Sequence, residues 1–114
     1  MIIRSTGLIR ALSFGSSSIL ALAIFPFIIL RRDLPEGIGP KAIIRHEKIH
    51  LRQQRELLVA PFYIWYAASY ILGRLRGKGH LEAYRDIRFE REAEANMDDE
   101  EYLARRRPRA FLRY

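Results

Sequence analysis

The chain has 114 residues, a formal net charge of +7 and 49% hydrophobic residues, and it contains no cysteine. Its length is that of one compact domain, which excludes a large enzyme with separate cofactor and substrate domains, and its apolar content excludes wholesale disorder. Without cysteine there is no disulfide framework and no thiolate ligand, so any bound metal must be held by histidine and carboxylate.

The charge is distributed unevenly along what we expect to be a single domain. Its parts are an apolar segment (1–35), a metal-binding helical core (36–107) and a basic tail (108–114). A basic protein is expected to meet an anionic surface. Nine acidic residues fall within 82–101, however, and the chain shows no nucleic-acid-binding pattern. We therefore expect no nucleic-acid partner and consider a membrane surface instead; oligomeric state is not indicated.

Residues 11–30 carry no charge and allow two interpretations. About 20 apolar residues match the length of a membrane-spanning helix. Alternatively, the polar stretch 14–18 is typical of a turn, and the aromatic and β-branched residues 25–30, interrupted at Pro26, favour a buried strand or hairpin. No small-residue cleavage site follows, so we expect no cleavable signal peptide. The predicted location is membrane-associated or cytoplasmic.

Helix-forming residues follow Pro40 and predict a helix over 41–58. Within it lies His46-Glu47-Lys48-Ile49-His50, an H-E-x-x-H motif. Two histidines four apart on a helix share one face and can both reach one Zn²⁺. In this motif the intervening Glu47 is placed to take a proton from a water at the metal. The motif therefore predicts a zinc site with Glu47 as the general base.

The next apolar stretch, residues 57–73, is uncharged and rich in tyrosine and tryptophan. Pro61 is suited to the start of a new helix. A buried core helix and a helix at a membrane surface both fit this composition.

A catalytic zinc site needs a third protein ligand. His80 lies among glycines and lysine, and we expect it at the surface. The predicted helix 88–96 offers Glu90, Glu92 and Glu94. Alternate residues do not share a helix face, so at most one of Glu90 and Glu92 can ligate. Glu94 shares the face of Glu90 and could orient a ligand histidine.

The H-E-x-x-H motif, followed forty residues later by E-x-E-A, resembles gluzincin-type zinc peptidases. Residues 43–107 resemble more closely a family of small bacterial proteins of uncharacterised function. Their pattern is roughly H-E-x-x-H-x-x-Q-[QY]-E, an aromatic-rich apolar helix, and Y-R-x-x-x-F-E-x-E-A. The resemblance implies that the first glutamate of E-x-E-A is the third zinc ligand. Two registers fit. The one that directly follows F-E-x-E-A is favoured, with Glu90 as the ligand supported by Glu94, and the alternative is Glu92 supported by Asn96.

The resemblance also implies a fold and a function. We expect a predominantly helical α+β protein with a minimal zincin-like core, in which the H-E-x-x-H helix packs on the E-x-E-A helix. The implied activity is zinc-dependent hydrolysis of a peptide or protein substrate, with residues 19–30 offering a strand edge to the peptide. The alternatives are a catalytically silent zinc-binding or interaction module, and a small basic membrane-associated protein with a chance motif.

Overall fold

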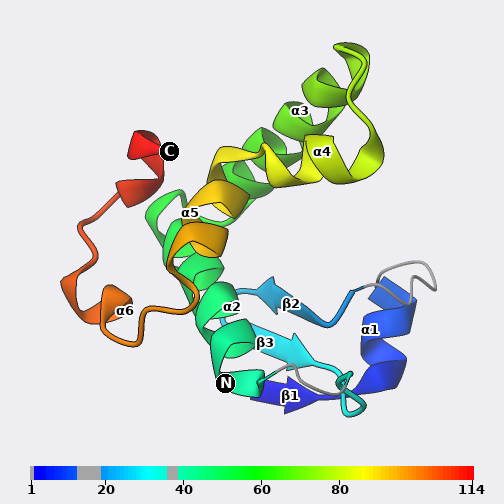
Figure 1. The fold of residues 1–114 in the computed structure, drawn as a ribbon, viewed down its shortest axis with the longest axis vertical. Helices are drawn as coiled ribbons and strands as arrows, with labels where there is room; N and C mark the ends of the chain where they lie inside the picture. The colour runs from blue at the N-terminus through cyan, green and yellow to red at the C-terminus, as the bar shows by residue number, and fades with distance from the viewer. Residues whose placement is uncertain (1, 13–18, 36–38) are drawn as a thin grey trace.

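The computed structural model describes residues 2–12, 19–35 and 39–114, and in it a small sheet lies beside a larger group of helices (Figure 1). The sheet has three strands in the order β1-β3-β2: β1 (Ile2–Arg4), β2 (Ala21–Ile24) and β3 (Phe27–Leu30). The central strand β3 pairs parallel with β1 and antiparallel with β2. The expected α+β, predominantly helical class is confirmed.

The apolar N-terminal residues form a hairpin rather than a membrane helix. Residues 21–30 make β2 and β3, joined by a turn at Phe25 and Pro26, so the helical alternative is wrong for this part of the chain. The polar turn expected at 14–18 lies outside the described residues. Strand β1 and helix α1 (Thr6–Leu12) were not indicated by the sequence, because each is too short to show a clear hydrophobic period.

Helix α2 (Pro40–Glu56) carries the H-E-x-x-H motif and stops two residues before the expected end. It stops because Leu58 and Val59 both have a φ of 62°, a left-handed conformation that is strained for a β-branched residue. The Ala60 amide donates to the Leu58 carbonyl at 2.7 Å, which closes a very tight turn. This turn sets α3 (Ala60–Leu75) at 114° to α2.

Helices α3 and α4 (His80–Arg85) form an arm that extends away from the sheet (Figure 1). They meet closely at Gly73, where an added Cβ would lie 3.1 Å from the Cβ of Ala83. The chain then returns through α5 (Arg88–Asn96), α6 (Tyr102–Arg105) and the short 3₁₀ helix η1 (Ala110–Arg113). The helix predicted at 88–96 is confirmed at both ends.

Helix α2 lies at the centre of the packing, between the sheet and α5. On one side Ile43 packs with Ala21 and Leu30 of the sheet; farther along, Ile49 packs with Ala93 and Tyr102. A third cluster joins α3, α5 and η1 through Phe62, Ile87, Phe89 and Phe111. Because Ile49 of α2 packs against Ala93 of α5, the polar residues between these two helices are held in close-packed surroundings.

Among the described residues, no single helix is both long and apolar enough to cross a membrane. The pair α2 and α3 reaches the required length and composition only together, across the 114° bend.

Candidate metal centre

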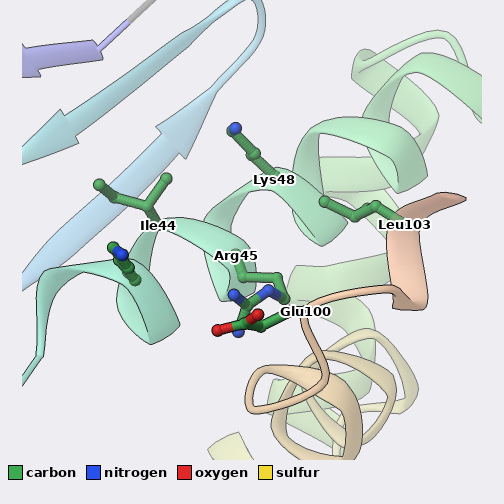
Figure 2. A pocket seen from close by; sticks show the side chains of 6 residues that line it. Ile44, Arg45, Lys48, Glu100 and Leu103 are labelled. Carbon is green, nitrogen blue, oxygen red and sulfur yellow. The ribbon is translucent and has the colours of Figure 1, made fainter.

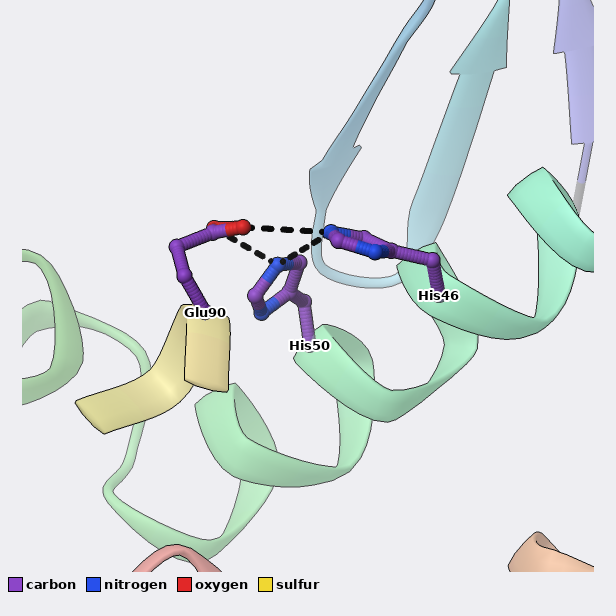
Figure 3. A group of neighbouring side chains, drawn as sticks. All are labelled: His46, His50 and Glu90. Carbon is purple, nitrogen blue, oxygen red and sulfur yellow. Dashed lines mark hydrogen bonds and ion pairs between the residues drawn. The ribbon is translucent and has the colours of Figure 1, made fainter. Parts of the chain in front are cut away.

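His46 and His50 of α2 and Glu90 of α5 direct their polar ends to one point (Figure 3). Nε2 of His46 lies 3.1 Å from Nε2 of His50 and 3.1 Å from Oε1 of Glu90, and Oε2 of Glu90 lies 2.8 Å from Nε2 of His50. All three residues are buried. Ligand atoms around a tetrahedral zinc ion are about 3.3 Å apart, from bonds of about 2.0–2.1 Å. The donor set therefore fits a metal ion after shifts of a few tenths of an ångström, roughly the tolerance expected of side chains.

Gln53 determines which nitrogen of His50 is left for this cluster. Its Nε2 donates to the backbone carbonyl of Phe89 at 3.1 Å and to Oε1 of Glu92 at 3.0 Å. Since both partners are acceptors, the other end of the amide must be the oxygen, and Oε1 lies 2.7 Å from Nδ1 of His50. Nδ1 therefore carries a proton, and Nε2 is the nitrogen that can bind a metal.

The electrostatics within the cluster are those of a pair of histidines facing a carboxylate. Burial lowers the pKa of His50, but the adjacent Glu90 outweighs it and raises this pKa to about 10. Conversely, burial raises the pKa of Glu90, while the charge on His50 and the histidine hydrogen bonds lower it below its usual range. Binding of a metal ion at Nε2 of His50 would therefore compete with protonation of that nitrogen.

Glu47 is buried beside the cluster without being part of it. Burial raises its pKa first of all, and the two histidines act in the opposite direction. A buried carboxylate with a raised pKa, next to three groups that could hold a metal ion but separate from them, is a candidate proton acceptor.

Tyrosines from the arm cover the outer side of Glu90. The hydroxyl of Tyr66 on α3 donates to Oε2 of Glu90 at 3.0 Å. Burial, followed by the charge on Glu90, raises the pKa of both Tyr66 and Tyr84 above the usual range. Both phenols therefore stay protonated at neutral pH, so Tyr66 acts as a hydrogen-bond donor that holds Glu90 in place.

Glu92, the alternative third ligand, points away from the histidines, because two residues along a helix turn a side chain to nearly the opposite face. Its carboxylate instead receives hydrogen bonds from Arg106 at 2.6 Å, Tyr102 at 2.6 Å and Gln53 at 3.0 Å. Arg106 is further paired with Glu56 at 3.0 Å. This buried network ties α6 to the back of the site through Gln53.

The remaining expected residues differ in their relation to the cluster. Glu94 is half exposed, and its Oε1 lies 3.8 Å from Nδ1 of His46, which is too long for a hydrogen bond, so its supporting role stays a prediction. Asn96 donates to the Glu92 carbonyl and to the Tyr114 hydroxyl, at 2.8 Å each, and does not support the histidines. His80 is exposed, as expected, and lies 2.8 Å from the Tyr70 hydroxyl.

Two open depressions lie on the surface near these helices. One, of about 510 Å³, is lined by Arg85, Arg91, Glu94 and Ala95, and so adjoins the cluster at Glu94. The other, of about 270 Å³, lies over the basic side of α2 and is lined by Lys41, Ile44, Arg45, Lys48, Glu100 and Leu103 (Figure 2). None of its lining residues belongs to the group of His46, His50 and Glu90, here called the metal cluster, whose two histidines lie on a different face of α2.

Sequence reasoning missed the residues that surround the ligands. Gln53 belonged to the recognised pattern, but nothing in the pattern showed that its amide bridges His50 and Glu92. Tyr66 and Arg106 gave no signal, because their roles depend on how α3 and α6 fold back on α5. No family model matches the chain, and neither the curated proteins nor the solved structures that were compared include a match.

Proposed function

We propose that this protein is a zinc-dependent metallopeptidase whose metal is held by His46, His50 and Glu90. The observation that carries the proposal is the convergence of these three buried donors, with the buried carboxylate of Glu47 beside them. Two histidines with one carboxylate is a donor set of catalytic zinc sites, in which the fourth position is left for water. The resemblance of the motif to gluzincin-type peptidases points in the same direction.

In the proposed reaction the chain's own groups handle the protons. A zinc ion bound here would lower the pKa of a water molecule and polarise the carbonyl of the scissile bond. Glu47 accepts a proton from the attacking water and returns it to the leaving amine. Its burial favours this role, because a carboxylate with a raised pKa is a stronger base than an exposed one.

A peptide substrate would be held along the edge of the sheet. Within the described residues β2 pairs only with β3, so no strand lies along its other edge. Helix α2 packs against β2. Part of that edge is already occupied, because Gln54 donates to the Ala23 carbonyl at 2.8 Å and Tyr63 donates to the same oxygen at 3.0 Å. We therefore propose that a bound peptide adds as a strand at the Ala21 end of β2.

The test separates metal binding from catalysis. Purified wild-type protein should contain about one zinc ion by elemental analysis and native mass spectrometry, consistent with a single three-ligand site. His46→Ala and His50→Ala should lose it, whereas His80→Ala, the matched control, should retain it. A wild-type protein that binds no zinc would overturn the proposal.

Glu47→Gln keeps the three ligands and removes the base. It should retain zinc and lose cleavage of a peptide library by at least about 100-fold, the usual contribution of general-base catalysis. If the wild type binds zinc but cleaves no peptide, the peptidase proposal fails and the protein is a catalytically silent zinc-binding module.

A further inference from the structure

The outer face of α3 is an unbroken apolar surface. Six residues on one side of the helix, in an i, i+4, i+7, i+8, i+11, i+15 pattern, are exposed: Ala60, Ile64, Ala67, Ala68, Ile71 and Leu75. Ile64 is 70% exposed and Leu75 78%. On an amphipathic helix at the surface of a protein in water, this face would carry charged residues. Isolated exposed leucines are ordinary, but a continuous apolar face on one helix indicates a binding surface.

The opposite face of α3 is the one that belongs to the core. Phe62 is buried, and Trp65 and Tyr66 pack against Phe89. The apolar outer face therefore cannot be explained as the packing face of the helix, because that role is already filled.

The charges within α3 and the loop that follows it are all positive, although Lys78 is paired with Asp86 at 2.6 Å and the adjacent α4 carries the exposed Glu82. From Leu57 to Gly79 the sequence contains no acidic residue, and its only charges are Arg74, Arg76 and Lys78 at the end of the helix. Arg55 stands just before the turn that leads into α3. An apolar face with cations at its ends complements a bilayer whose headgroups are anionic, since side chains enter the acyl boundary while arginines contact phosphates.

The length of α3 indicates that it lies on a bilayer rather than crossing one. Sixteen residues extend about 24 Å, less than the roughly 30 Å of a hydrocarbon core. The inner face of the helix is also occupied by the protein's own aromatic cluster, so only one side is available to lipid.

We propose that the α3 face formed by Ala60, Ile64, Ala67, Ala68, Ile71 and Leu75 binds the surface of an anionic lipid bilayer. Each turn contributes one or two of these side chains to the acyl boundary. Arg74 and Arg76 contact the headgroup phosphates at the end of the helix. This surface is independent of the metal proposal, because none of its residues contacts the metal cluster.

The test is co-sedimentation of the full chain with lipid vesicles. Wild-type protein should sediment with vesicles of phosphatidylcholine mixed with phosphatidylglycerol, and more weakly with phosphatidylcholine alone. The double variant Ile64→Asp/Ile71→Asp should lose binding by roughly tenfold or more, because two charges would enter the apolar boundary. Arg74→Glu/Arg76→Glu should reduce binding to the anionic vesicles by a similar factor, and added salt should weaken wild-type binding.

The matched control is Leu8→Asp, which replaces an exposed leucine of α1, a helix beside the sheet and separate from the arm (Figure 1). It should bind vesicles as the wild type does. Circular dichroism should show that the variants of α3 and α1 are folded, since the side chains changed in them are exposed, and it should be recorded for the buried His50→Ala variant as well. His50→Ala, which removes a proposed metal ligand, should also bind vesicles normally. Failure of the metal proposal could then be told apart from failure of the vesicle-binding proposal.

Three results would each overturn the inference. The first is wild-type protein that does not sediment with anionic vesicles, and the second is an Ile64→Asp/Ile71→Asp variant that sediments as well as the wild type. The third is a lipid-independent dimer in analytical ultracentrifugation that the same double variant dissociates, because the face would then be occupied by a second copy of the chain.

Discussion

Nδ1 of His50 is held 2.7 Å from the side-chain oxygen of Gln53, and this contact fixes the tautomer of the histidine. The orientation of the Gln53 amide is fixed in turn by two acceptors on its other side, the Phe89 carbonyl and Glu92. Glu92 is anchored by Arg106. A contact chain therefore runs from α6 to the metal cluster, and the C-terminal part of the protein supports the site although it provides no ligand.

Gln53→Ala should weaken zinc binding while leaving all three ligands in place. Removal of a hydrogen bond to a ligand histidine usually reduces metal affinity by about 10–100-fold. The matched control is Gln54→Ala, since Gln54 is equally buried but bonds to Ala23 and Phe25 of the hairpin. Competition with a chromogenic zinc chelator would measure both affinities. Equal zinc affinity in the two variants would contradict the role of Gln53.

Glu90→Gln and Glu92→Gln should separate ligation from structural support. Glu90→Gln should lose zinc, because a neutral amide replaces the only carboxylate in the cluster. Glu92→Gln should retain zinc but weaken the buried pair with Arg106, which lowers the free energy of unfolding by about 2 kcal/mol. Zinc content and urea unfolding of both variants provide the measurement. Loss of zinc in Glu92→Gln together with its retention in Glu90→Gln would favour the other register.

Tyr66→Phe should affect the site, whereas Tyr70→Phe, one turn further along α3, should not. The Tyr66 hydroxyl holds Oε2 of Glu90, but the Tyr70 hydroxyl contacts exposed His80. We expect zinc affinity to fall about tenfold in Tyr66→Phe, as for other hydrogen bonds to a ligand. The same chelator competition measures this change, and unaltered affinity in Tyr66→Phe would show that Glu90 needs no such donor.

Zinc should stabilise the folded protein, because an unfolded chain does not hold the three ligands together. At a free zinc concentration 100 times the Kd the gain is about 2.7 kcal/mol. For a domain of this size that raises Tm by roughly 10 °C. Differential scanning fluorimetry with zinc and with a chelator would show the shift. His46→Ala should show no shift, and a shift of the same size there would place the zinc elsewhere.

Gly73→Val should destabilise the arm formed by α3 and α4. A Cβ at this position already meets the Cβ of Ala83 at 3.1 Å, and two further methyl groups have no space. Overpacking of this kind costs about 1–3 kcal/mol. At Gly79 no atom lies within 4 Å of an added Cβ, so Gly79→Ala is the control. Thermal unfolding compares them, and equal Tm values would show that α3 and α4 separate at little cost.

The sequence by itself determined the motif, the helices that carry it and the ligand types. Without cysteine, a metal could be bound only by histidine and carboxylate, and the spacing of His46 and His50 put both on one helix face. The pattern of residues 88–96 also defined, at both its ends, the helix that carries Glu90 and Glu92, the two candidates for the third ligand. These features are local, because they depend on residues within one or two turns of each other.

Only the tertiary structure shows which of Glu90 and Glu92 lies beside the histidines. Both are buried glutamates of α5, and the sequence pattern fits either as the third ligand. The choice depends on how α5 is rotated against α2, which is set by the packing of Ile49 against Ala93 and by the burial of Phe89. That rotation aims Glu90 at the histidines and Glu92 at Arg106, a contact between distant parts of the chain that no local pattern contains. In the same way, the sequence showed that residues 57–73 are apolar, and the fold determined which side of α3 remains exposed.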